Sequence, residues 1–191
     1  MLVVLLVLLS VGLFFAIKIK HVVKGAQYYL FYEETASELV IAEQIAEKVK
    51  AKGGAGYVID LNAQYYVVVN AYNSEERANA VANKNGGKVL KLALPTLEFD
   101  TKKQATALKK EYDVIGNYAF SLCEVSYAYD CGRESREGVK AEIEAYEKKI
   151  KTEEHPLFEL LTVLPENFYE GVKIKFYVCD IIFSAYKYFS Q

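Results

Sequence analysis

Two stretches decide the fold of this chain: QYYLFY at residues 27–32 and QYYVVVNAY at residues 64–72. Both are runs of aromatic and β-branched residues bounded by turn formers, which is the pattern of a β-strand. Each is followed by an alanine-rich stretch whose apolar residues recur every three or four positions, and this spacing predicts an amphipathic helix. A glycine pair, at 53–54 or 86–87, then ends the helix before a further short apolar strand.

The two units form an internal repeat of strand, helix and strand over residues 25–94. Two such units in tandem predict a ferredoxin-like βαββαβ domain, with four antiparallel strands and both helices on one face of the sheet. In this topology the strands at 27–32 and 64–72 are the central neighbours of the sheet.

From Pro95 onward the pattern changes to long helices. Apolar residues alternate steps of three and four from Ala105 to Tyr129, and similar spacing returns in the later stretches 134–151 and 172–189. Connections as short as these favour antiparallel neighbours. Residues 96–191 are therefore predicted to form an antiparallel α-helical bundle.

The first 17 residues contain no charged side chain, and Lys18, Lys20 and Lys24 follow them. As a helix they would reach about 25 Å, and the flanking lysines can snorkel to complete a hydrocarbon core of roughly 30 Å. Because the run exceeds a usual signal-peptide core, we expect residues 1–20 to form an uncleaved transmembrane helix. The predicted fold class is thus α+β, with this helix first, the βαββαβ domain over 25–94 next, and the bundle over 96–191 last.

Composition excludes several classes of function. The 191-residue chain has a net charge of -2, which argues against nucleic acid as its main partner. It has only two histidines. We could assemble neither a nucleophile with its base nor a set of metal ligands from the sequence, so we expect neither an enzyme nor a cofactor. Cys123 and Cys131 could pair if oxidised, whereas Cys179 is typical of a buried apolar position.

The repeat resembles the SPOR (sporulation-related repeat) domain. Residues 65–72 followed by Asn73-Ser74-Glu75-Glu76-Arg77-Ala78 parallel the aromatic strand, turn and helix of that family, and residues 50–59 parallel its glycine turn. The chain departs from the family at three positions. Phe31 and Glu33 stand where the first strand usually has Gln and Gly, and Asn70 stands where the second repeat favours Gly.

The resemblance implies binding of peptidoglycan glycan strands, without catalysis, especially strands stripped of their stem peptides at a division or sporulation septum. It also implies a bacterial single-pass membrane protein whose main domain is extracytoplasmic. The three lysines after the predicted span favour the opposite, cytoplasmic side by the positive-inside rule. An envelope protein is the other partner that fits this location.

Strand alternation selects the side chains that a ligand on the open sheet face could touch. If Leu30 and Tyr32 face the helices in the first strand, and Val67 and Val69 do so in the second, the intervening residues point outward. The predicted glycan-binding residues are therefore Tyr29, Phe31, Glu33, Tyr66, Val68 and Asn70.

Two alternatives stay open at this point. The bundle could cover the open sheet face, since large exposed apolar patches are uncommon, and glycan binding on that face would then fail. The chain could instead be a membrane-tethered protein–protein interaction adapter that uses the helical bundle for contact.

Overall fold

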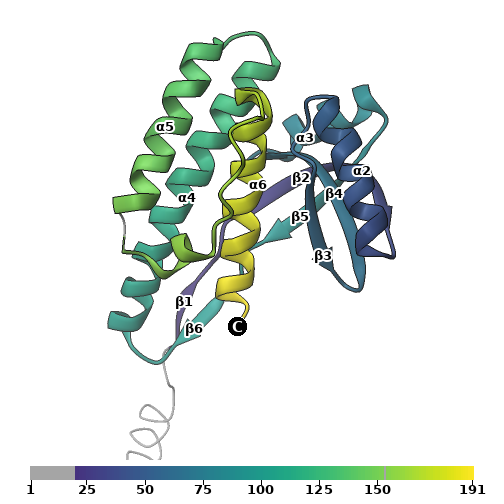
Figure 1. Cartoon of the computed structure of the whole chain (residues 1–191). Helices are drawn as coiled ribbons and strands as arrows, with labels where there is room; N and C mark the ends of the chain where they lie inside the picture. Colours follow the sequence, from purple (N-terminus) through teal and green to yellow (C-terminus); the bar gives the residue numbers. More distant parts are fainter. Residues whose placement is uncertain (1–19, 153) are drawn as a thin grey trace, which may run out of the picture.

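The computed structural model describes residues 20–152 and 154–191. Over these residues the chain forms two sheets, five α-helices and a short 3-10 helix, η1 (Figure 1). The elements are, in chain order, β1 His21–Val23, β2 Gln27–Ala36, α2 Leu39–Ala51, β3 Tyr57–Leu61, β4 Gln64–Tyr72, α3 Glu75–Asn85, β5 Lys88–Ala93, β6 Leu97–Phe99, α4 Lys102–Asp130, α5 Arg136–Thr152, η1 Pro156–Leu160 and α6 Glu170–Phe189.

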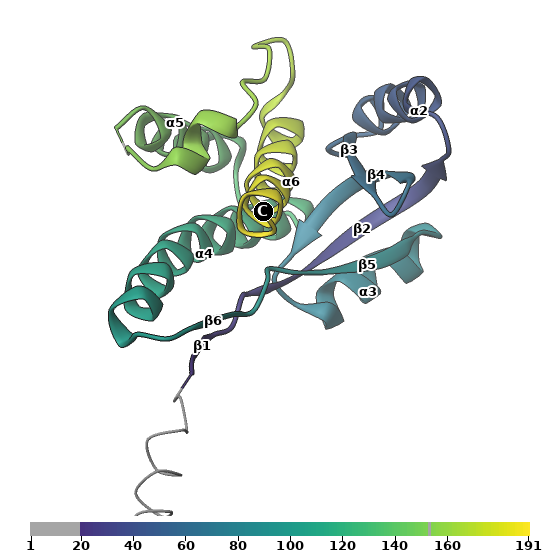
Figure 2. The ribbon, with the colours of Figure 1, turned by 90° about the horizontal axis from the view of Figure 1, so that it is seen from below.

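The larger sheet has the strand order β3-β4-β2-β5, and all of its neighbouring strands are antiparallel. The aromatic strands β2 and β4 are its two central members. Helices α2 and α3 pack on one face of the sheet (Figure 2). The alanines of each helix form an apolar cluster with residues of the strands, and Val69 of β4 packs against both clusters. Small alanine side chains let the two helices lie close to the strands.

Helices α4 and α6 cover the opposite face of the sheet (Figure 2). Leu30 of β2, Ile59 of β3 and Val68 of β4 are fully buried in one apolar core with residues of α4, α5 and α6. The ring of Tyr57 packs edge-on against Phe176 and Phe183 of α6. The face expected to be open is therefore covered by the bundle, which rules out glycan binding on that face.

A buried carboxylate strengthens the contact between α6 and the sheet. Asp180 accepts hydrogen bonds from the Tyr57 hydroxyl at 2.9 Å and from the Thr162 backbone N–H at 2.7 Å. Burial raises the pKa of Asp180, because removal from water disfavours the charged form. The bond from Thr162 ties the segment before α6 to that helix, and the bond from Tyr57 ties the helix to strand β3.

A second, two-stranded sheet pairs β1 with β6. It continues the line of β2 and β5, since the Leu94 N–H donates to the Ala26 carbonyl between the two sheets. Helix α4 packs on both of its strands. Three-residue strands give too little sequence pattern to be predicted, and this ribbon was not anticipated.

The expected fold class requires a correction. The segment predicted to span a membrane, residues 1–20, lies outside the described residues except for Lys20. Within the described ranges, no helix has both the length and the apolar character needed to cross a bilayer. Even the most apolar one, α6, carries Lys173, Lys175, Asp180 and Lys187. The prediction of a single-pass membrane protein is corrected accordingly, and the described fold is α+β with two sheets and five α-helices.

The turn between β3 and β4 offers a test of backbone strain. Asn62 and Ala63 have φ angles of 55° and 59°, as a type I′ hairpin turn requires. The Cβ of Ala63 costs about 1–2 kcal/mol in this left-handed conformation, and glycine avoids that cost. Because glycine also loosens the unfolded chain, we expect Ala63→Gly to raise the free energy of unfolding by about 0.5–1 kcal/mol in urea denaturation.

The matched control is Ala107→Gly, within helix α4, where the same substitution should lower the free energy of unfolding by about 1 kcal/mol. A loss of stability in the Ala63→Gly variant would contradict the conformation described for this turn.

Candidate binding cavity

A cavity of about 560 Å³ lies where the α2–β3 turn, β4, α3 and the C-terminal end of α4 meet. Its volume falls within the roughly 300–1,000 Å³ of typical small-molecule sites. Gly53 and Gly54 line one side, Val81 of α3 lines another, and Lys175 reaches the cavity from α6. The cavity is thus built jointly by the repeat and the bundle.

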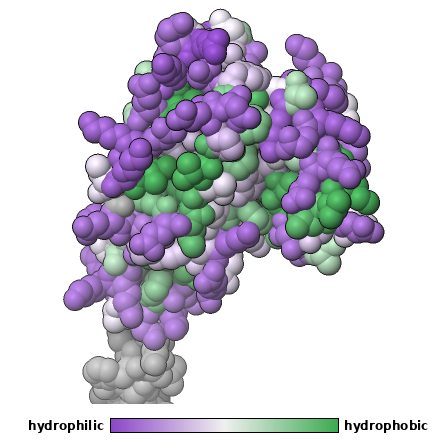
Figure 3. All heavy atoms as spheres, in the orientation of Figure 1, coloured by the Kyte–Doolittle hydropathy of each residue, from purple (hydrophilic) through white to green (hydrophobic). Residues whose placement is uncertain are grey.

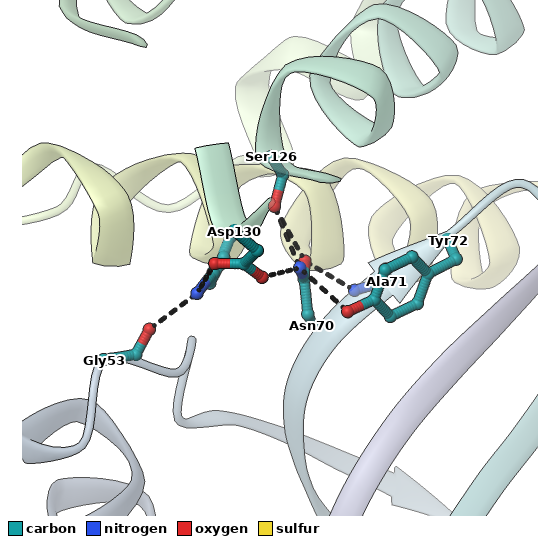
Figure 4. Close-up of polar contacts among 7 residues, drawn as sticks. Gly53, Asn70, Ala71, Tyr72, Ser126 and Asp130 are labelled. Carbon is teal, nitrogen blue, oxygen red and sulfur yellow. Dashed lines mark hydrogen bonds and ion pairs between the residues drawn. The ribbon is translucent and has the colours of Figure 1, made fainter. Parts of the chain in front are cut away.

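Lys175 connects three segments at the cavity wall, and Figure 4 labels its two partners, Gly53 and Asp130. Its Nζ donates to the Gly53 carbonyl at 3.0 Å and lies 2.5 Å from Oδ1 of Asp130 at the end of α4. The Lys175 residue is only 8% exposed. An ammonium group this deeply placed needs its partners, because burying an unpaired charge is costly. The ion pair therefore fixes α6 and α4 against the α2–β3 turn.

Asn70 of β4 extends this network into the sheet. Its Nδ2 lies 2.9 Å from the Ser126 hydroxyl and 3.3 Å from Oδ2 of Asp130, and its Oδ1 accepts the Ala71 N–H at 2.8 Å (Figure 4). The residue is 1% exposed. The side-chain amide of Asn70 is therefore fully engaged by neighbouring groups. Its contact with Oδ2 helps to fix the Asp130 carboxylate beside the cavity.

The charged rim combines both signs. Lys52, after α2, pairs with Glu33 of β2 at 3.3 Å, and both side chains line the cavity. Lys84 and Asn85, in the last turn of α3, line it from the other side. The cavity therefore offers ammonium donors, carboxylate acceptors and an amide within one space.

Aromatic rings supply part of the remaining surface. Phe31 of β2, Tyr72 of β4 and Tyr127 of α4 line the cavity. The Tyr72 and Tyr127 rings pack edge to face at 6.2 Å. Burial raises the pKa of Tyr72, so its hydroxyl stays protonated. The guanidinium carbons of Arg77 and Arg133 lie over the Tyr127 ring, 4.7 and 5.2 Å from its centroid.

Of the six residues predicted to bind a ligand, three line this cavity and three do not. Phe31, Glu33 and Asn70 line it. Tyr29 packs beside α3 in the cluster of Phe31, Tyr72 and the α3 alanines. Val68 is buried in the core shared with the bundle, and Tyr66 packs against that core and against the Tyr32 ring. The structure therefore does not bring the predicted set together on one surface.

The outward orientation predicted for the first strand is wrong. Phe31 faces α3, whereas Leu30 faces the bundle core. Alternation could not identify the covered face here, because both faces of β2 are buried and consecutive residues are apolar. The pairing of β2 with β4 also shifts register around Tyr32, which a regular alternation does not anticipate.

The bundle contributes cavity residues that sequence reasoning missed, namely Lys175, Asp130 and Tyr127. One signal was available: Lys175 interrupts the apolar stretch of α6, and a buried lysine needs an anionic partner.

The three cysteines are free, with Cys131 exposed at the cavity rim. In the part of the chain that the structure describes, no group of three or more His, Cys, Asp or Glu side chains could hold a metal ion.

The fold and the cavity define an α+β protein with a ligand-sized site between a βαββαβ unit and a helical bundle. No protein-family model matches the sequence, and no curated protein matches it. Among solved structures, the chain is similar to the solution structure of the peptidoglycan binding domain of the B. subtilis cell wall lytic enzyme CwlC. The two share 18% sequence identity over 38% of this chain and 96% of that chain, with a TM-score of 0.29.

Proposed function

We propose that this chain is a noncatalytic binding protein for peptidoglycan glycan, and that a sugar segment occupies the cavity between α2, α3 and the end of α4. The observation that carries the proposal is the lining of the cavity, which combines aromatic rings with ammonium, carboxylate and amide groups. A sugar ring has an apolar C–H face that stacks on an aromatic ring and hydroxyls that bond to polar groups.

We infer separate roles for the lining residues. The half-buried Tyr127 ring provides apolar surface for the sugar face, and the buried Phe31 ring supports the wall of the cavity. Hydrogen-bond donors at the rim come from Lys52, Lys84 and Asn85. The partly exposed Asp130 carboxylate can accept hydrogen bonds from ligand hydroxyls. Lys175 and Asn70 hold Asp130 in place, so the acceptor is preorganised before any ligand arrives.

The choice of peptidoglycan among glycans comes from the resemblance of the repeat to SPOR domains. The narrower hypothesis is that the ligand is a glycan strand without stem peptides, as found at a division or sporulation septum. Removal of a stem peptide leaves a carboxylate on the sugar strand, and the lysines at the cavity rim would favour such a group.

Co-sedimentation of the purified full chain with peptidoglycan sacculi tests the proposal. We expect the chain to pellet with sacculi, more strongly after enzymatic removal of the stem peptides, and to stay in the supernatant with cellulose. Retention that is equal on cellulose would show nonspecific adsorption and contradict the proposal. Absence of retention on both forms of sacculi would also contradict it and would favour a protein–protein adapter.

A further inference from the structure

Strand β3 forms one edge of the larger sheet, and over the described residues its outer side pairs with no other strand. Edge strands are usually guarded against pairing by lysine, proline or a bulge. The opposite edge, β5, carries Lys88 and Lys91. By contrast, β3 has the sequence YVIDL, pairs with β4 without a register shift, and contains Asp60 as its one charged residue.

The hairpin turn determines which backbone groups of β3 point outward. In a two-residue hairpin the residues that flank the turn, here Leu61 and Gln64, form a hydrogen-bonded pair, and pair types alternate along an antiparallel ladder. On this alternation Ile59 directs its N–H and C=O toward β4. Val58 and Asp60 direct theirs to the outer edge.

This arrangement is self-complementary. Two antiparallel β3 strands related by a two-fold axis at Ile59 would place Val58 of each copy opposite Asp60 of the other. These are the two residues whose backbone groups point outward, so each pair can exchange both hydrogen bonds. The Asp60 carboxylates do not stand opposite each other, which avoids a like-charge pair.

The adjacent helix has an unpartnered apolar surface that fits the same arrangement. Leu39, Val40 and Ile41, in the first turn of α2, are 46%, 62% and 44% exposed. Helix α2 packs on β3 and β4, and Figure 3 shows apolar atoms gathered on this lobe of the molecule. A two-fold axis normal to the sheet brings α2 alongside its symmetry mate.

The charges of α2 favour an antiparallel approach of the two helices. Its exposed acids Glu38 and Glu43 lie at or near its start, and its exposed bases Lys48 and Lys52 lie at or near its end. A third exposed acid, Glu47, also lies near the end, where it pairs with Lys50 at 2.8 Å and leaves that half of the helix basic. Antiparallel packing places the acidic half of one helix against the basic half of the other.

We propose that a second copy of this chain docks edge to edge on β3, extending the sheet across a two-fold axis at Ile59 and packing the two α2 helices antiparallel. A two-fold interface uses the same patch on both copies. The pairing of Val58 with Asp60 on β3 and the distribution of charges along α2 both fit such an interface.

Disulfide trapping tests the register. Each variant carries Cys131→Ser to remove the exposed native thiol. When full chains carrying V58C and D60C are mixed and oxidised, we expect a cross-linked dimer, because opposite residues in such a pair have Cα atoms about 5.5 Å apart. Either variant alone should give little dimer, because its two thiols are offset along the strands. Equal cross-linking in the single variants and the mixture, or none in any sample, would overturn the proposal.

Light scattering of the purified full chain tests the interface independently. We expect a dimer that D60P converts to a monomer, since proline removes an N–H that points away from β4. If D60P does not fold by circular dichroism, V40K decides, with V163K as the control because Val163 is 89% exposed on another segment. A wild-type monomer, or a dimer that V40K and a folded D60P leave intact, would contradict the interface.

Discussion

Replacing Lys175 by alanine should lower the free energy of unfolding by about 2 kcal/mol, because it removes a buried side chain and its charged hydrogen bonds and leaves the partly exposed Asp130 carboxylate without its cation. It also removes the donor to the Gly53 carbonyl, which anchors the α2–β3 turn to α6. For a domain of this size, the melting temperature should fall by roughly 4–8 °C. Thermal and urea unfolding of the purified chain measure both quantities.

The matched control is Lys173→Ala, two residues earlier on α6, where the side chain is partly exposed and the change should stay within about 0.5 kcal/mol. Removing both partners in a Lys175→Ala, Asp130→Ala variant should cost less than the sum of the two single changes, because neither charge is then left unpaired. A Lys175→Ala variant as stable as the control would show that the ion pair does not hold the bundle on the sheet.

Filling the cavity should abolish ligand binding without unfolding the protein. Ala80 lines the cavity from α3 and is exposed, so a tryptophan there can occupy the space without entering the core. We expect Ala80→Trp to weaken retention on peptidoglycan at least tenfold, which corresponds to about 1.4 kcal/mol of binding free energy. Co-sedimentation over a range of polymer concentrations gives the affinity.

Ala107→Trp provides the control, because Ala107 is exposed on α4 and does not line the cavity. Both variants should keep the melting temperature of the unmodified chain to within a few degrees. Equal binding by the Ala80→Trp and Ala107→Trp variants would place the glycan elsewhere on the molecule.

The repeat made most of the elements predictable from sequence. The aromatic strands at 27–32 and 64–72 correspond to β2 and β4, and both lie at the centre of the sheet as the topology requires. Their patterns are strong because β-branched and aromatic runs favour strands locally. The long helices from Lys102 onward have apolar periodicity over several turns, which also depends only on neighbouring residues.

The faces of the strands and the composition of the cavity could not be predicted in the same way. Leu30 and Phe31 are consecutive and both buried, because different helices cover the two faces of β2. Which helix covers which face depends on contacts between residues far apart in the chain. The same holds for Lys175, whose partners are Asp130 on another helix and Gly53 in a distant turn.

The most direct measurement is a nuclear magnetic resonance titration of the ¹⁵N-labelled full chain with a soluble glycan fragment prepared from peptidoglycan. Binding in the cavity predicts saturable shifts of the backbone amides that line it, among them Gly53, Ala80 and Asn85. The same titration of the Ala80→Trp variant should show no saturable shifts. Shifts confined to amides outside the cavity, or none at high glycan concentration, would contradict glycan binding at this site.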